Sequence, residues 1–263
     1  MKSLISSSVL AVSLLTLPKA LAVTPVDIEL SLLVDISGSI SSSEYDMQML
    51  GYQAAFESDR LQNAIINGTE GQIAVQLIMW SGSSQQQVMI DWSLINSAQS
   101  ADDFAQDISG LARPFSGWTA IGSAIDFAAP LFNSNEYEGF EQIIDISGDG
   151  TNNSGRSVAA ASNDAIASGI DTINGIVITQ RQSVVDQYTT QVINGDSPFL
   201  LATTNFQDFQ QAIENKIVAE IEGSRPAGAI TVPAPGTNVL FIIALICIFG
   251  SRVLAKENTH ETV

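Results

Sequence analysis

Apolar and polar residues alternate along the chain in blocks that predict strands and helices in turn. Residues 26–34 are an almost continuous apolar run, as expected of a strand buried on both faces of a parallel sheet. Apolar side chains then recur at helical spacing from Tyr45 to Phe56, which predicts one helix over residues 43–66 with this stripe in the core. In residues 72–80, apolar residues alternate with smaller or polar ones, which predicts a second strand.

The same alternation continues to residue 222. We predict a third strand at residues 87–92, which the short connection makes an antiparallel edge strand. The later predicted elements are helices at residues 101–112, 119–132, 158–168 and 206–222, and strands at residues 140–147, 170–178 and 199–202. Strands that alternate with helices indicate an α/β fold, with a doubly wound, mostly parallel sheet flanked by helices.

Both ends of the chain differ in composition from the part between them. Residues 1–22 carry an early Lys, an apolar core and small residues before position 23, which is typical of a secretory signal peptide. Residues 23–223 are the predicted domain, and residues 224–236 are a Pro/Gly/Ala linker. Residues 237–263 hold an apolar block of twelve residues, short for a permanent membrane span, and then a basic end. The protein is therefore predicted to be exported, with a tail that either anchors it or is removed.

The charge and the rare residues exclude several functions. The net charge is −18, and residues 23–231 alone contain six Lys and Arg against 26 Asp and Glu. Nucleic acid is therefore excluded as a partner, because it would require a basic patch. The one Cys is Cys247 and the one His is His260, both in the tail. Catalysis by imidazole and zinc binding through Cys or His are thus not expected in the domain.

Oxygen-bearing side chains stand at alternate positions where the first strand ends. They are Asp35, Ser37 and Ser39, and Gly38 permits a tight turn between the two serines. Carboxylate and hydroxyl oxygens are hard ligands of the kind that Mg²⁺, Mn²⁺ and Ca²⁺ accept. The alternative is that Asp35 only caps the next helix.

Two later segments have the same character. Thr119 lies in a Gly-bounded loop before a helix, where its hydroxyl is either an N-cap or a metal ligand. Asp149 stands between two glycines at the end of another apolar strand. Asp145 to Gly150 also fit the start of an EF-hand loop, but Arg156 occupies the position that requires a bidentate Glu, so that interpretation fails.

In order and spacing, these three segments resemble the von Willebrand factor type A (vWA) family over about residues 26–222. The resemblance implies a metal ion-dependent adhesion site (MIDAS) formed by Asp35, Ser37, Ser39, Thr119 and Asp149. It implies that Ser37 and Ser39 bind the cation directly and that Thr119 does so in one state. The two aspartates act through water or enter the first shell. Trp118 stands where relatives often have a second Gly, and it either covers the rim of the sheet or contacts a partner.

The resemblance also implies a cofactor and a partner. The cofactor is a divalent cation, with Mg²⁺ preferred over Mn²⁺ or Ca²⁺. The partner is a protein or polysaccharide ligand whose carboxylate completes the coordination of this cation. The tail resembles a PEP-CTERM sorting signal of Gram-negative bacteria, which implies processing by an exosortase-like enzyme. Ala234 replaces the usual Glu of that motif.

We therefore hypothesise a non-enzymatic, metal-dependent adhesion module. We expect it at the cell envelope, held there by its C-terminal tail in the membrane, or in the extracellular matrix after tail processing. One alternative is a metal-dependent hydrolase that uses Asp35, although Ser37 stands where phosphatases of the haloacid dehalogenase type have their acid/base Asp. The other alternative is a structural surface-matrix protein without a specific metal-mediated partner.

Overall fold

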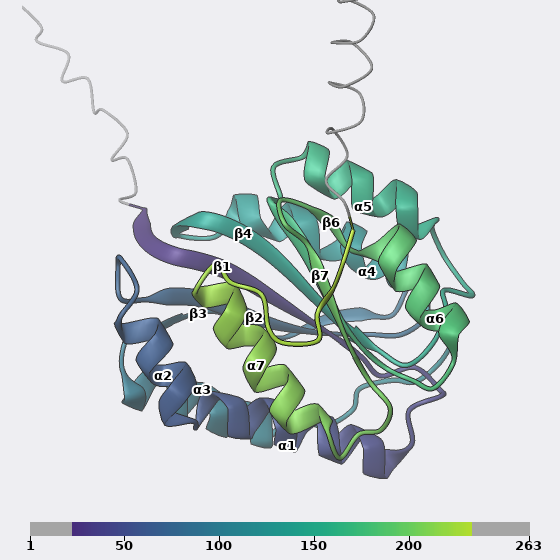
Figure 1. The fold of residues 1–263 in the computed structure, drawn as a ribbon, viewed down its shortest axis with the longest axis horizontal. Helices are drawn as coiled ribbons and strands as arrows, with labels where there is room; N and C mark the ends of the chain where they lie inside the picture. Colours follow the sequence, from purple (N-terminus) through teal and green to yellow (C-terminus); the bar gives the residue numbers. More distant parts are fainter. Residues whose placement is uncertain (1–22, 233–263) are drawn as a thin grey trace, which may run out of the picture.

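Residues 23–232 form a mixed β-sheet with helices on both faces (Figure 1). They are the part of the chain that the computed structural model describes. The strands are β1 (Thr24–Asp35), β2 (Ile73–Trp80), β3 (Gln86–Ile95), β4 (Tyr137–Gly148), β5 (Thr172–Ile178), β6 (Asn194–Gly195), β7 (Phe199–Thr203) and β8 (Ile230–Thr231). The α-helices are α1 (Ser42–Phe56), α2 (Asp59–Ile66), α3 (Ala98–Ser109), α4 (Ile121–Ala128), α5 (Val158–Ala167), α6 (Gln182–Gln187) and α7 (Phe209–Ile221).

The strand order confirms the predicted doubly wound sheet. It is β3-β2-β1-β4-β5-β7-β8, with β6 beside β5. The central strands β2, β1, β4, β5 and β7 are parallel, and β3 is antiparallel at one edge, as expected. The chain leaves β1 for β2 and β3 and then returns to β4 on the other side of β1. The topological switch point, where ligands bind in such sheets, is therefore at the carboxyl ends of β1 and β4.

The central strand β1 contributes to two separate cores. Leu30, Leu32 and Val34 pack into the core that includes residues of α1, α3 and α7. Leu33 points to the other face and packs into the core that includes residues of α4 and α5. Figure 1 shows α1, α2, α3 and α7 along one face of the sheet, with α4, α5 and α6 on the other. Burying each of these side chains stabilises the fold by about 2 kcal/mol of transfer free energy.

The predicted helix over residues 43–66 is wrong in one respect, because the structure has two helices there. α1 ends at Phe56, and α2 begins after Ser58, whose hydroxyl accepts the Leu61 N–H at 3.1 Å. This N-cap satisfies a donor that a continuous helix would bond internally, so it fixes the break. The predicted stripe from Tyr45 to Phe56 is buried. α3 begins at Ala98 rather than at residue 101, because Ser97 and Ser100 form a capping box.

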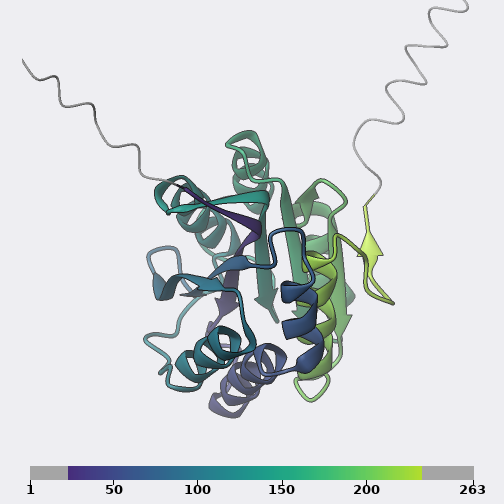
Figure 2. The ribbon, with the colours of Figure 1, turned by 90° about the vertical axis from the view of Figure 1, so that its left-hand side faces the viewer.

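Several short elements lie where none was expected. Between β5 and β7 the chain forms α6, a π-helical turn (Tyr188–Val192) and β6. The helix after Thr119 is also shorter than predicted, since it continues as a 3₁₀ helix, Ala129–Ser134. Within the segment interpreted as a linker, β8 pairs with β7 in the antiparallel sense at the edge of the sheet (Figure 2).

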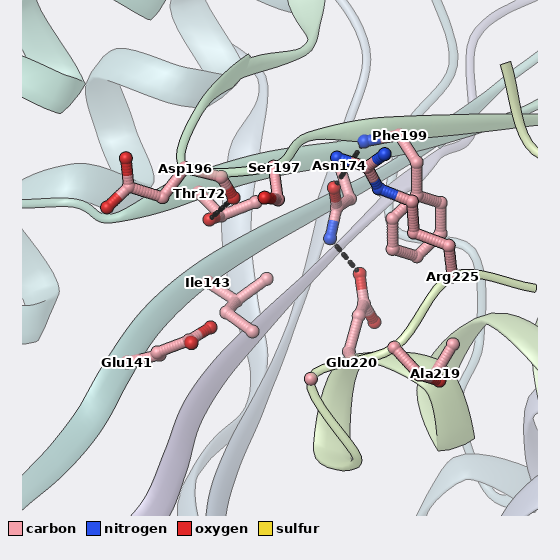
Figure 3. A pocket seen from close by; sticks show the side chains of 12 residues that line it. Glu141, Ile143, Thr172, Asn174, Asp196, Ser197, Phe199, Ala219, Glu220 and Arg225 are labelled. Carbon is pink, nitrogen blue, oxygen red and sulfur yellow. Dashed lines mark hydrogen bonds between the residues drawn. The ribbon is translucent and has the colours of Figure 1, made fainter. Parts of the chain in front are cut away.

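A buried charged cluster joins α7 to the sheet. Lys216 on α7 is fully buried, and its Nζ lies 2.7 Å from Asp145 Oδ1 on β4 and 2.5 Å from Glu220 Oε1. Glu220 also accepts a hydrogen bond of 2.8 Å from Asn174 on β5, as Figure 3 shows. Burial raises the pKa of Glu220 to about 7 and also raises that of Asp145. One buried ammonium thus offsets two buried carboxylates.

The predicted segments at the two ends lie outside the described residues. They are the signal peptide at residues 1–22, nearly all of the sorting motif and the apolar tail at residues 237–263. Within residues 23–232, no helix combines the length and the apolar character that crossing a membrane requires.

Candidate functional site

The loop after β1 gathers its oxygen atoms into a small cluster. Asp35 and Ser37 are fully buried, and the Ser37 N–H donates a 2.7 Å hydrogen bond to Asp35 Oδ1. The Ser37 and Ser39 hydroxyl oxygens lie 3.1 Å apart. The strand buries Asp35 while the turn carries Ser39 to the surface, so the cluster runs from the interior to solvent.

Asp149, from the loop after β4, completes this cluster from the neighbouring strand. The Ser39 hydroxyl donates to Asp149 Oδ1 at 2.6 Å, although the two residues are 110 positions apart. β1 and β4 are adjacent and parallel, so their carboxyl ends bring the two loops together. The predicted residues Asp35, Ser37, Ser39 and Asp149 are therefore neighbours in space.

Thr119 also lies at this cluster and is not the N-cap of α4. The N-cap is Ala120, and no side chain makes a capping hydrogen bond there. A Cβ atom added to Gly150 would lie 3.5 Å from Thr119 Oγ1 and 4.0 Å from Ser39 Oγ, so both hydroxyls lie close to the same point beside Gly150. The alternative of Thr119 as a simple N-cap is wrong.

Two side chains that the sequence analysis did not assign to the site hold its loops. Arg113 donates to the carbonyl oxygens of Ile36 and Ser37, both at 2.6 Å, and to that of Ile40 at 2.8 Å. A guanidinium has donors for all three, so Arg113 fixes the turn after β1. Asn153 Oδ1 accepts the Thr119 N–H at 2.9 Å, which fixes the third loop.

The electrostatics of the cluster favour a cation. Burial raises the pKa of Asp35 to about 7, and the charge of Asp149 acts in the same direction. Burial likewise raises the pKa of Asp149. Asp35 Oδ2 is buried and has no hydrogen-bond partner among the described residues. A positive charge at the cluster would offset both the burial and the mutual repulsion of these carboxylates.

The donor set fits a hard divalent cation. Carboxylate and hydroxyl oxygens are the ligands of Mg²⁺, Mn²⁺ and Ca²⁺, and the buried Asp35 Oδ2 is an acceptor that needs a partner. Within residues 23–232, no three His, Cys, Asp or Glu side chains are grouped so that they could share a metal ion. A cation here would consequently depend on the hydroxyls of Ser37, Ser39 and Thr119.

A comparison with known protein families shows to which family the chain belongs. The family described as "Protein of unknown function (DUF1194)" matches residues 25–225, which is more than half of the sequence. The chain belongs to the DUF1194 family. A search of the curated proteins found no match to this DUF1194 protein.

Solved structures show that this DUF1194 protein has a vWA-type fold. Proximal thread matrix protein 1 (PTMP1) from the mussel byssus, whose structure is described with a zinc-occupied MIDAS motif, superposes with a TM-score of 0.56 at 18% identity. The pilus adhesin SpaC from Lactobacillus rhamnosus GG gives 0.54 at 14% identity. A von Willebrand factor type A protein from Catenulispora acidiphila gives 0.52, also at 14%.

These matches cover most of the DUF1194 chain but only part of each neighbour. The covered share of the chain is 76% for PTMP1 and SpaC and 74% for the Catenulispora protein. The covered share of each neighbour is 49% for PTMP1, 31% for SpaC and 43% for the Catenulispora protein. The chain therefore spans about half or less of the length of these proteins, and the likeness concerns the fold.

Two further residues of the DUF1194 protein shape the surroundings of the site. Trp118, beside Thr119, is 68% exposed, so most of its side chain is open to solvent next to the site. Tyr188 is fully buried, and a Cβ added to Gly148 would lie 2.3 Å from its hydroxyl and 3.0 Å from Asp35 Oδ2. Only glycine fits at position 148, because any side chain would push Tyr188 or Asp35 from its place. The sequence offered no signal for Tyr188, since it contacts the site from a π-helical turn.

Proposed function

We propose that this protein is a non-enzymatic, metal-dependent binding module of the vWA type. Asp35, Ser37, Ser39, Thr119 and Asp149 would hold one divalent cation, Mg²⁺ before Mn²⁺ or Ca²⁺. The bound cation would supply a positive centre for a carboxylate of a protein or polysaccharide partner. The proposal includes export to the cell envelope or extracellular matrix, with processing of the tail by an exosortase-like enzyme.

One observation carries this proposal. Asp35 Oδ2 is a buried carboxylate oxygen without a hydrogen-bond partner among residues 23–232, and it lies beside hydrogen-bonded Ser and Asp side chains that reach the surface at Ser39 and Asp149. A metal-free protein would have to keep this costly arrangement without compensation. Support also comes from the fold, because the cluster lies at the switch point of the sheet. The zinc-occupied MIDAS motif of PTMP1 belongs to a neighbour of the same fold.

Cation titration tests the proposal. We expect full-length protein, stripped with a chelator, to bind one Mg²⁺ per chain in calorimetry and to gain thermal stability from it. Mass action gives about 2.7 kcal/mol of stabilisation at a cation concentration 100 times Kd. The Ser39→Ala variant should bind more weakly, because it loses one hydroxyl ligand. If neither Mg²⁺, Mn²⁺ nor Ca²⁺ binds the parent protein, the metal-dependent function is wrong and a structural role without metal is favoured.

Arg113 should act on the same site without contacting the cation. In Arg113→Met the three carbonyl bonds that fix the turn after β1 are lost, so Ser37 and Ser39 are no longer held in place. We expect the cation affinity to fall by about 10- to 100-fold, the usual cost of losing a supporting residue of a metal site. The measurement is the same calorimetric titration.

Arg156→Met is the matched control for Arg113. Arg156 pairs with Asp126 and Asp164 on the surface and makes no contact with the turn after β1. Its replacement should leave the cation affinity within about twofold of the parent value, since exposed ion pairs contribute little. Equal losses in the two variants would mean that Arg113 has no positioning role.

A further inference from the structure

A polar groove adjoins the candidate cation site. It lies between α1 and the loops after β5 and β7, and its cavity volume is about 300 Å³. Asp149 and Glu44 form part of its wall, so the groove is continuous with the site. A ligand that places one group at the cluster would therefore extend along this groove.

Arg181 gives the groove a positive charge beside the site. Its side chain is exposed, and Nη2 donates to the Asp149 carbonyl oxygen at 2.9 Å. No ion pair among residues 23–232 involves Arg181. By contrast, Arg60, Arg156 and Lys216 are paired with carboxylates. In a domain with such an excess of acidic residues, a guanidinium with donors to spare at a binding groove indicates an anionic ligand.

The remaining wall suits hydroxyl groups rather than apolar side chains. Gln180 and Gln207 are exposed, and their amides make no side-chain hydrogen bond to other residues that the structure describes. Ile178 and Phe206 also line the groove, but they are only 5% and 7% exposed, so the half-buried Met47 is the main apolar side chain that it offers. Protein partners usually insert aromatic or aliphatic anchors into apolar pockets, and one half-buried methionine among mostly polar lining residues does not form such a pocket. Amides that can donate and accept match the hydroxyls of a sugar chain.

We propose that this groove is a second subsite for an acidic polysaccharide. This inference rests on the proposed function, since one sugar carboxylate would complete the cation. A carboxylate farther along the chain would pair with Arg181, and sugar hydroxyls would bond with Gln180 and Gln207. Glu44 on the wall repels carboxylates, so it confines the second one to the side of Arg181. Arg181 is thus a specificity-determining residue.

Binding of an oligouronate to Mg²⁺-loaded full-length protein tests this inference. The probe is a hexamer of galacturonate, and a hexamer of galactose is its uncharged counterpart. We expect the oligouronate to bind in calorimetry, and Arg181→Gln to weaken it by about tenfold, in the range for a charge at a binding site. Glu44→Gln, which retains a capping side chain, should tighten it about threefold because a like charge is removed. The galactose hexamer should not bind.

Arg225→Gln is the matched control, because Arg225 lines a different cavity, beside Glu141 and Glu220. It should bind the oligouronate as the parent does. A cation titration of every variant accompanies the test, because Arg181 also contacts the Asp149 backbone. If Arg181→Gln loses cation and oligouronate affinity equally, Arg181 only positions Asp149 and the inference is wrong.

Other outcomes separate the inference from the proposed function. A parent that binds Mg²⁺ but not the oligouronate retains the cation site and refutes the polysaccharide subsite. Binding of poly-glutamate in an Arg181-dependent manner, without oligouronate binding, assigns the groove to an acidic peptide and also refutes it. A parent that binds neither cation nor oligouronate refutes both proposals.

Discussion

Replacement of Asp149 by Asn is expected to abolish detectable cation binding while the domain stays folded. Asn has the same shape, and its side-chain oxygen can still accept the hydrogen bond from Ser39 that Asp149 accepts at 2.6 Å. Only the charge is lost. A unit charge about 4 Å from another is worth about 4 kcal/mol at an effective dielectric constant of about 20. The cation affinity should therefore fall at least about 100-fold in calorimetric titration.

Asp35→Asn should behave in the same way, because Asp35 supplies the buried carboxylate oxygen that has no partner within the described residues. The control is Asp126→Asn, which removes an exposed carboxylate that is paired with Arg156. Its cation affinity should match that of the parent. Unchanged affinity in Asp149→Asn, with circular dichroism showing a native fold, would mean that the carboxylate at position 149 takes no part in a cation site.

Among the variants proposed here, Lys216→Met is expected to lose the most stability. Met fills a similar volume but leaves Asp145 and Glu220 buried beside each other without the ammonium that contacts both. Removing one partner from a buried ion pair costs about 3 to 5 kcal/mol. The free energy of unfolding, measured in urea at pH 8, should fall by this amount. The control is Arg60→Met, which removes an exposed cation of α2 that lies near Glu214 of α7. It should lower the free energy of unfolding by less than about 1 kcal/mol.

The loss in Lys216→Met should also depend on pH. The pKa of Glu220 in the folded protein is about 7, above its ordinary value of 4.5. The folded state therefore binds a proton more tightly than the unfolded state, and this stabilisation is present below pH 4.5 and is lost as the pH rises through 7. Without the ammonium, only protonation can neutralise the buried carboxylates of Asp145 and Glu220. The variant should therefore regain stability relative to the parent as the pH is lowered from 8 to 5. A difference that stays constant over this range would contradict the proposed role of the buried charges.

Local sequence signals predicted the parts of the site that lie at strand ends. Asp35 directly follows an apolar run, and Asp149 stands between two glycines just after another, so the place of each at the carboxyl edge of the sheet follows from the pattern of a single segment. The order of strands in a doubly wound sheet then brings the two ends together. The resemblance to the vWA family added Thr119, which periodicity alone would have left as a possible helix cap.

The supporting residues could not be predicted because their contacts are not local. Arg113 bonds to carbonyl groups 73 to 77 positions away, and nothing in its neighbourhood marks it. Lys216 lies in an amphipathic helix, where a lysine is normally exposed. Only the assembled sheet shows that Asp145 neutralises it. Periodicity does not reveal the break between α1 and α2, because apolar positions continue across Ser58, while the N-cap bond that starts α2 depends on one hydroxyl.

The position of β8 determines how an attached domain would be oriented. β8 pairs with Phe199 and Leu200, which begin β7, so the chain leaves the domain at the amino ends of the parallel strands. Thr24 begins β1 at the same end. The cluster of Asp35, Ser39 and Asp149 is at the other end, about 40 Å away for a strand of twelve residues. An attachment at either terminus would thus hold the domain by its base and point its cation site outward.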